Sequence, residues 1–525
     1  MDILTQLSQQ ARAAVQRRDW NRVALIAGQI QQQFPQEPEG YFLSGLVEKA
    51  TGRGERAIQA FAKSLSLDSQ RYDAAVELAN QYWHALRHGE AFKLLDHHEP
   101  QLQNSPLYLD MAARIFSGLG LHDRAWPLFE KANQLQPEVD LFRANLAACG
   151  ILLGKVEQAK AIYQSLLKKY PQHQKNHYEF AKIQKAKDST HVEQMKAILN
   201  ETNLPADKNI FLYYAIGKEL EDLEHWKESF EYYKLAGEAV LSVAKYEVED
   251  DIKVIDKTIN VCNSEWLTQG QDSRANEESQ KTPIFIVGLP RTGTTLTERI
   301  ISSHSKVESA DETFFMQIAI RHASGEGGLG DASEAIVEKA SKNDINLIAQ
   351  KYLDSIEYRL SGQPMFIDKY PFNYLYLGFI AKAFLKARIV YLRRNPLDAC
   401  FALFKQSFFK FAYSLEDLGR YYVAQDKLRR HWQALLGERI VEVEYEKLIA
   451  DQEGQTRYIL QRLGLDFEEA CMQFEQNPTA SATASTLQVR EKIHARSVHK
   501  WKRFAEQLQP LKKYLTDAGI NTGDA

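Results

Sequence analysis

The sequence predicts a multidomain protein in which an all-α helical repeat solenoid is followed by an α/β domain with a central parallel sheet. Two observations predict this fold: small residues recur every 34 residues through the first half, and short apolar runs ending in glycine, lysine or arginine follow in the second half. At 525 residues the chain is also long enough for two or more domains. We therefore expect a repeat array over residues 1–262, a polar linker over 263–282 and the α/β domain over 283–525.

Two series of small residues carry the 34-residue period. One consists of Ala57, Ala91, Ala125 and Ala159, and the other of Gly45, Ala79, Ala113, Ala147 and Ala181. The two positions lie twelve residues apart, which places them on the two helices of a helix–turn–helix unit, where small side chains let the helices approach closely. These spacings resemble tetratricopeptide repeats over roughly residues 5–240. The resemblance implies a concave surface that binds a protein or a peptide.

The overall composition argues against several classes of protein. Lys and Arg number 65 against 69 Asp and Glu, and this balance disfavours a general nucleic-acid binder. Residues 1–20 lack the apolar core of a signal peptide, and lysines and an arginine interrupt the most apolar stretch, residues 372–392, so we expect no membrane span. The cysteines are far apart, which predicts reduced thiols in a cytoplasmic protein; they are Cys149, Cys262, Cys400 and Cys471.

Residues 283–312 open the second domain with an anion-binding strand–loop–helix pattern. An apolar strand over 284–287 leads into a loop over 288–293, and a helix from 294 presents free N–H groups and a positive dipole end to a phosphate or sulfate. The spacing Gly-x4-Gly is that of a P-loop, but Thr294 stands where a Walker A motif has the lysine that serves a triphosphate. Arg291, inside the loop, can instead contact one terminal phosphate or sulfonate with its planar fork.

The loop residues PRTGTT after an apolar strand resemble the 5′-phosphosulfate-binding loop of sulfotransferases that use 3′-phosphoadenosine 5′-phosphosulfate (PAPS). The resemblance implies that the cofactor is bound by Pro290, Arg291, Thr292, Gly293, Thr294 and Thr295. Tyrosylprotein sulfotransferases, which this domain resembles, carry their catalytic base in a Glu-Thr at the offset of Glu312, and a carboxylate suits removal of a hydroxyl proton. The alternative is a solvated loop acid or a helix cap, a role open to Asp311 as well.

Two further strand ends match the same family. Lys369 follows a short apolar strand, where it can point into the crevice at the carboxyl end of a sheet. The resemblance implies that Lys369, with Arg291, stabilises the charge that develops on the transferring sulfonate and the leaving oxygen. The alternative is a surface pair of Asp368 with Lys369.

Arg394 ends the next apolar strand and matches the arginine that holds the 3′-phosphate of the cofactor. The family has a serine eight residues later, and this chain has Ala402 there. Loss of one neutral hydrogen bond costs about 1 kcal/mol, so we expect weaker cofactor binding and not its abolition. A backbone amide or Ser407 could compensate.

The C-terminal region resembles the cofactor-closing segment of bacterial and protein sulfotransferases. In residues 483–490 and 497–501, Ser485 matches a phosphosulfate contact and Lys500 a 3′-phosphate contact. Tyr445, in the alternating strand pattern of residues 438–448, is expected to be structural.

The most probable function from these residues is a sulfotransferase that moves a sulfonate from PAPS to an acceptor hydroxyl, on a protein or peptide presented by the repeat array. No metal is expected, because arginine, lysine and backbone amides meet the ligand charge. One alternative is a kinase-like P-loop enzyme, which the missing Walker lysine disfavours. The other is a protein-interaction scaffold with a degenerate, inactive sulfotransferase domain, which Ala402 favours.

Overall fold

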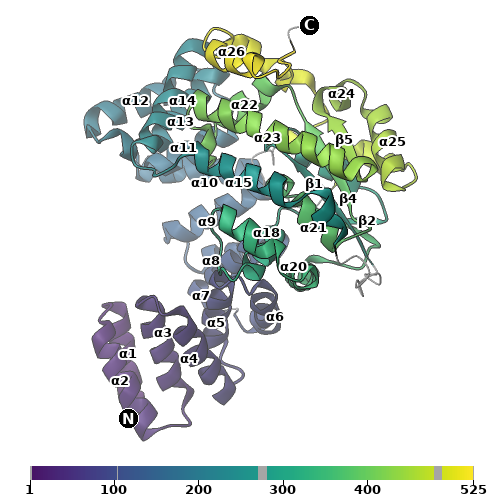
Figure 1. Cartoon of the computed structure of the whole chain (residues 1–525). Helices are drawn as coiled ribbons and strands as arrows, with labels where there is room; N and C mark the ends of the chain where they lie inside the picture. Colours follow the sequence, from purple (N-terminus) through teal and green to yellow (C-terminus); the bar gives the residue numbers. More distant parts are fainter. Residues whose placement is uncertain (1–2, 103, 270–280, 478–487, 524–525) are drawn as a thin grey trace. The chain divides into compact units, whose positions relative to one another are not determined.

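The computed structural model describes residues 3–102, 104–269, 281–477 and 488–523 (Figure 1). The chain forms two compact units, Met1–Cys149 and Gly150–Ala525. The second unit contains both the later repeat helices and the sheet, and the linker expected at residues 263–282 lies within it. The predicted domain boundaries therefore stay a prediction.

The first unit is built of consecutive antiparallel helices, coloured purple to blue in Figure 1. They are α1 (Ile3–Gln16), α2 (Trp20–Gln33), α3 (Pro38–Ala50), α4 (Gly54–Leu67), α5 (Tyr72–His84), α6 (His88–His98), α7 (Pro106–Gly118), α8 (His122–Leu135) and most of α9 (Asp140–Leu152). The small residues of the 34-residue period lie where paired helices meet: Ala57, Ala91 and Ala125 are fully buried. A Cβ at Gly45 of α3 would lie 2.5 Å from Cδ1 of Phe61 on α4, so this helix contact requires glycine.

The second unit begins with the remaining repeat helices. These are α10 (Val156–Lys169), α11 (Gln174–Ile183), α12 (Thr190–Thr202), α13 (Ile210–Asp222), α14 (Trp226–Leu241) and α15 (Val248–Val261). The twelve-residue offset holds to the end of the array, since Ser229 on α14 donates a hydrogen bond of 2.7 Å to the carbonyl oxygen of Gly217 on α13. The predicted helical repeat region is confirmed.

A five-stranded parallel sheet forms the centre of the rest of the second unit. Its strands are β1 (Thr282–Gly288), β2 (Val307–Ser309), β3 (Met365–Asp368), β4 (Arg388–Arg393) and β5 (Ile440–Glu444), in the spatial order β2-β3-β1-β4-β5. Ile284 of β1 pairs with Ile367 of β3 on one side and with Arg388 of β4 on the other. The predicted α/β domain with a parallel sheet is confirmed. The chain leaves β1 toward β2 and leaves β4 toward β5, and ligands of such sheets bind outside the carboxyl ends of the strands where this direction changes.

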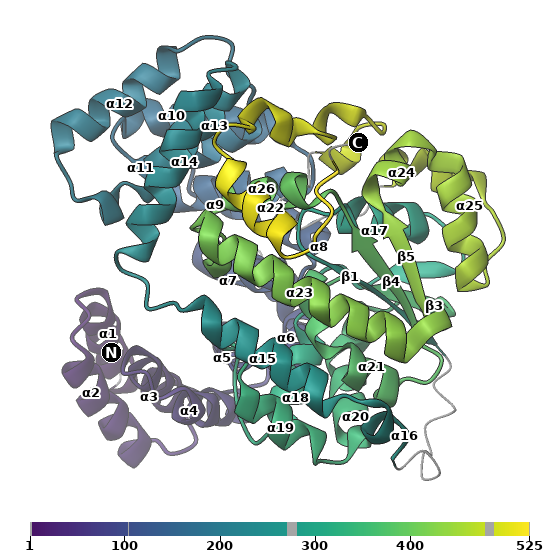
Figure 2. The same ribbon diagram turned by 45° about the horizontal axis from the view of Figure 1, so that its top comes forward.

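Helices cover both faces of the sheet, which is why its central strands are apolar throughout. Helices α17 (Thr294–Ser302), α24 (Tyr445–Ala450) and α25 (Gln452–Leu463) lie on one face (Figure 2). Ile284 and Ile286 of β1 belong to one buried cluster with apolar residues of these helices. On the other face Phe285 stacks near Tyr352 of α20 (Ile345–Ile356), and α21 (Leu377–Ala383) and α23 (Leu415–Leu436) complete the layer. Within the described ranges, no helix has both the length and the apolar character needed to cross a membrane.

Candidate functional site

The loop between β1 and α17 has a conformation that only this glycine spacing allows. Gly288 and Gly293 both have positive φ angles, of 142° and 97°. A Cβ at Gly288 would lie 2.5 Å from the carbonyl oxygen of Leu392, and one at Gly293 would lie 2.6 Å from Cδ2 of Tyr445. The Thr292 hydroxyl donates a hydrogen bond of 2.6 Å to the carbonyl oxygen of Leu289 and closes the loop from inside. The predicted strand, loop and helix start at 294 are all confirmed.

The loop forms one wall of a cavity of about 470 Å³. Eight of the predicted site residues line it, namely Pro290, Arg291, Gly293, Thr294, Thr295, Glu312, Arg394 and Lys500. Thr292 and Lys369 do not line the cavity. Thr292 is hydrogen-bonded within the loop that lines it, and Lys369 is hydrogen-bonded to Glu312, which lines it. Ser485 lies outside the described residues. The structure therefore brings most of the candidate residues together at one cavity, and the role of each residue stays a prediction.

Positive charge dominates the cavity. Its lining includes the six cations Arg291, Arg394, Lys405, Lys492, Arg496 and Lys500, against the carboxylates of Glu312, Asp398 and Glu491. Burial, together with nearby Arg394, lowers the pKa of Arg291 to about 10, so that this guanidinium still carries its charge at neutral pH. Such a lining suits an anionic ligand.

Hydrogen bonds to two backbone carbonyl oxygens orient the guanidinium of Arg394. Its two terminal nitrogens donate to the carbonyl oxygens of Arg291 at 2.9 Å and of Ser497 at 2.5 Å, and its guanidinium lies 4.8 Å from the ring centroid of Tyr445. The Nε of Arg394 is buried without a hydrogen-bond partner among the described residues. A buried donor without a partner is costly, and an anion in the cavity could accept from it. The residues present therefore fit a phosphorylated or sulfonated ligand.

Glu312, which lines the cavity, forms an ion pair with the buried Lys369 behind it. Nζ of Lys369 lies 2.5 Å from Oε2 of Glu312 and 3.8 Å from Oε2 of Glu298. Lys369 is fully buried, whereas the Glu312 side chain is 28 % exposed. Burial lowers the pKa of Lys369, but Glu312, Glu298 and Asp311 outweigh it, and the net shift is upward.

The structure contradicts two of the alternatives, the surface pair of Asp368 with Lys369 and the helix cap at residues 311–312. Asp368 and Lys369 are both fully buried and do not form a surface pair, because Asp368 accepts hydrogen bonds from Thr313 at 3.1 Å and Tyr352 at 3.0 Å. The helix after Glu312, α18 (Phe315–Ala323), starts with no side-chain cap, so neither Asp311 nor Glu312 caps it.

The sequence did not point to Glu298 as an acid beside Lys369. Burial raises the pKa of Glu298 to about 7, and Asp311 adds to this, while Lys369 and the Ser309 hydroxyl oppose it. Burial likewise raises the pKa of Asp368 to about 7 against the hydrogen bonds of Tyr352 and Thr313. Glu298 lies on the mostly polar first turns of α17, just after the loop, and that position was the available signal.

Ala402, which has no hydroxyl, lines the cavity. Lys405, three residues later, also lines the cavity, while Ser407 does not and instead shares a hydrogen bond of 3.3 Å with Tyr178. Ser407 as a substitute is therefore wrong. Lys405 follows directly after the last residue of α22 (Pro396–Phe404), and its position three residues after Ala402 was a signal that the sequence already contained. Tyr445, expected to be structural, also lines the cavity.

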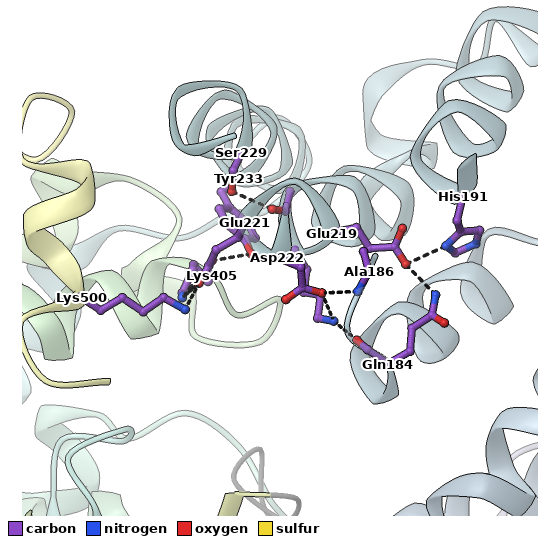
Figure 3. A network of polar contacts seen from close by, with 12 residues as sticks. Gln184, Ala186, His191, Glu219, Glu221, Asp222, Ser229, Tyr233, Lys405 and Lys500 are labelled. Carbon is purple, nitrogen blue, oxygen red and sulfur yellow. Dashed lines mark hydrogen bonds and ion pairs between the residues drawn. The ribbon is translucent and has the colours of Figure 1, made fainter. Parts of the chain in front are cut away.

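The C-terminal segment brings Lys500 to the cavity. Asp398, on α22 (Pro396–Phe404), accepts hydrogen bonds from the backbone N–H groups of His499 at 2.7 Å and Trp501 at 2.9 Å. Lys500 and Lys405 both form ion pairs with Glu221 of repeat helix α13 (Figure 3). Nothing in the local sequence around Glu221 predicts this contact.

Among the described residues, no cluster of three or more His, Cys, Asp or Glu side chains is arranged to hold a metal ion.

Two family models match parts of this chain. Residues 283–469 match the sulfotransferase family, and residues 118–179 match the tetratricopeptide repeat. An uncharacterized protein of Aquifex aeolicus (strain VF5) is 28 % identical over 407 residues, which cover 74 % of this chain and 52 % of that protein. The chain thus spans about half the length of this relative.

Solved structures with some similarity include proteins of both kinds. The sulfotransferase domain from the curacin biosynthetic pathway is 16 % identical and covers 46 % of this chain and 98 % of its own, with a TM-score of 0.35. The sulfotransferase domain from the Synechococcus PCC 7002 olefin synthase is 20 % identical over 46 % of this chain and 97 % of its own, with a TM-score of 0.34. The TPR protein YrrB is 14 % identical over 40 % of this chain and 97 % of its own, with a TM-score of 0.29. On the family matches, this chain carries a tetratricopeptide repeat and a domain of the sulfotransferase family.

Proposed function

We propose that the protein is a sulfotransferase that uses PAPS as donor and transfers the sulfonate to an acceptor hydroxyl. One observation carries the proposal: the glycine-dependent loop, a surplus of cations and an ion-paired carboxylate face one cavity. PAPS, when bound, would supply the sulfonate and an adenosine 3′,5′-bisphosphate leaving group.

The loop and α17 would hold the phosphosulfate end of the donor. The first N–H groups of a helix have no partner within the helix, and they attract anions together with the helix dipole. Arg291 and Arg394 add charge-assisted hydrogen bonds next to these N–H groups. Because the loop has no Walker lysine, this arrangement suits a phosphosulfate better than a triphosphate.

Glu312 would act as the general base. Its carboxylate is partly exposed at the cavity, and a carboxylate there can remove the proton from an attacking hydroxyl. Lys369 holds this carboxylate from its buried side and places a positive charge behind the reacting groups. On this proposal Lys369 positions Glu312, and a direct contact of Lys369 with the sulfonate stays a prediction.

The acceptor, on this proposal, is a hydroxyl of a protein or peptide that the repeat array binds. A groove of about 780 Å³ lies among helices α10 to α13, and the exposed lysines Lys168, Lys185 and Lys187 contribute to its lining. A groove of this size, on the helices that lead into the sheet domain, supports a peptide ligand. We also propose a cytoplasmic location, which suits four buried free cysteines.

Isothermal titration of the full chain with adenosine 3′,5′-bisphosphate is the direct test. Binding of the bisphosphate is expected without added metal. Tight binding of ATP with Mg²⁺ and none of the bisphosphate would favour a kinase-like enzyme, and absence of both would favour the inactive scaffold. In parallel, ³⁵S-labelled PAPS and a cell extract should yield label in the protein fraction. Label only in small molecules would exclude the protein acceptor.

A further inference from the structure

The cavity end near Ala402 has a cation where the family pattern has a hydroxyl. The methyl group of Ala402 can make no hydrogen bond, but Lys405 follows three residues later and lines the same cavity. The Lys405 side chain keeps 16 % of its surface exposed. Its ammonium group can therefore reach a ligand beside Ala402.

A carboxylate from the repeat array holds Lys405 in place. Oε1 and Oε2 of Glu221 lie 2.9 Å and 3.0 Å from Nζ of Lys405. Glu221 also accepts a hydrogen bond of 3.0 Å from the hydroxyl of Tyr233 on α14 and pairs with Lys500 (Figure 3). Although burial raises the pKa of Glu221, Lys405 and Lys500 lower it to about 2, so Glu221 is ionised at neutral pH.

Helix α13, which carries Glu221, is itself firmly anchored on its other side. Glu219 accepts hydrogen bonds from His191 at 2.7 Å and Gln184 at 3.0 Å, and Asp222 accepts one of 2.9 Å from the backbone N–H of Ala186 (Figure 3). Glu221 therefore presents its carboxylate from a fixed element, and the position of Lys405 follows from that of α13.

One carboxylate does not balance the charge at this end. Lys405 and Lys500 share Glu221, and Arg291 lies near enough to lower the pKa of Lys405 further. The carboxylate of Asp398 is already engaged by two backbone N–H groups. The remaining positive charge suits a phosphate group, which carries up to two negative charges.

We propose that Lys405 is a specificity-determining residue that recognises a second phosphate on the nucleotide in place of the hydroxyl missing at Ala402, and that Glu221 of repeat helix α13 positions it. This inference rests on the proposed use of an adenosine nucleotide. On this inference, the repeat array is a part of the nucleotide site. The preference for a bisphosphate over a monophosphate then depends on the contact between Glu221 of the array and Lys405 of the sheet domain.

The test compares the dissociation constants of adenosine 3′,5′-bisphosphate and adenosine 5′-monophosphate by calorimetry on the full chain. The wild type should prefer the bisphosphate by at least about tenfold. Lys405→Met should lose most of this preference and bind the monophosphate as the wild type does, and Lys405→Arg should restore much of it. Glu221→Gln should reduce the preference several-fold.

Lys427→Met is the matched control. Lys427 also pairs with a carboxylate of the helical array, Asp256 of α15, at 2.8 Å, but it does not line the cavity. This variant should keep the wild-type preference. If Lys405→Met fails to fold, the double variant Glu221→Gln/Lys405→Met removes the buried charges together and should bind both nucleotides equally.

The outcomes separate this inference from the proposed function. If the wild type binds neither nucleotide, the proposed function is wrong and the inference falls with it. If the wild type binds the bisphosphate and either Lys405→Met or the double variant keeps the full preference, Lys405 is not the recognition residue and only the inference is overturned.

Discussion

Two buried lysine–glutamate groups border the same cavity, and their charge balance is opposite. In the first, which we call the acidic group, Lys369 is surrounded by Glu298, Asp311 and Glu312. In the second, the basic group, Lys405 and Lys500 share Glu221 and lie near Arg291. Burial disfavours the charge on both central lysines, but the carboxylates raise the pKa of Lys369, whereas the pKa of Lys405 falls to about 8 despite Glu221.

The difference shows that the number and sign of the neighbouring charges, and not burial alone, decide whether each group suits a proton or an anion. Surplus carboxylates suit the uptake of a proton, and a surplus of ammonium groups suits the binding of an anion. The proposed division of labour follows: the acidic group serves the transfer step, and the basic group serves nucleotide recognition.

The largest effect is expected from Glu312→Gln. The amide keeps the size and the hydrogen bond to Lys369 but cannot accept a proton, so sulfonate transfer should fall about a thousandfold. Affinity for adenosine 3′,5′-bisphosphate should change less than about threefold, because the basic group is intact. Label transfer and calorimetry on the same preparation measure the two quantities. Equal transfer by variant and wild type would remove Glu312 from the base role.

Glu221→Gln should have the next largest effect, on stability. Lys405 would lose its carboxylate while remaining largely buried, and breaking a buried pair from one side typically costs about 3 kcal/mol. Adding Lys405→Met to this variant should recover most of the loss, since no buried charge is then left alone. Denaturant unfolding of the two single variants and the double variant measures the coupling. Purely additive losses would mean that Glu221 and Lys405 do not act as a pair.

Much of this arrangement could be predicted where the signal is local in sequence. The apolar run of β1 and the spacing from Gly288 to Gly293 located the loop, and the 34-residue period located the helical array. The basic group was not predictable in the same way, because Glu221 and Lys405 are 184 residues apart and meet only when α13 packs on the sheet domain. Composition and periodicity are properties of single segments, so neither can reveal an ion pair that forms between two distant segments.

The acidic group should also reveal itself in the pH dependence of stability. The pKa of Glu298 rises from 4.5 to about 7 on folding, so the folded state binds more protons between these values. The free energy of unfolding therefore falls as pH rises through this window, and the loss is complete above about 7. Glu298→Gln lacks the ionisation and should be more stable than the wild type at pH 8, by up to about 3 kcal/mol, but not at pH 4.5.

Glu308 offers the matched control for this pH effect. Burial raises its pKa, but hydrogen bonds from Ser361 and Lys281 outweigh it, and the net shift is downward. Its contribution to stability is therefore present above pH 4.5 and is lost as the pH falls. Glu308→Gln should be less stable than the wild type at pH 8. Thermal unfolding at both pH values distinguishes the two glutamates, and equal behaviour would contradict the assignment of opposite shifts.

The smallest effect is expected from Lys500→Met, which tests the basic group at its exposed edge. The Lys500 side chain is 36 % exposed, against 16 % for Lys405, so water and salt screen its charge more. Affinity for adenosine 3′,5′-bisphosphate should fall only about two- to fivefold at physiological salt, and the loss should shrink further as salt increases. Lys405→Met, measured beside it, should lose more affinity and depend less on salt. A larger loss for Lys500→Met would mean that the C-terminal segment, and not Lys405, supplies the main phosphate contact.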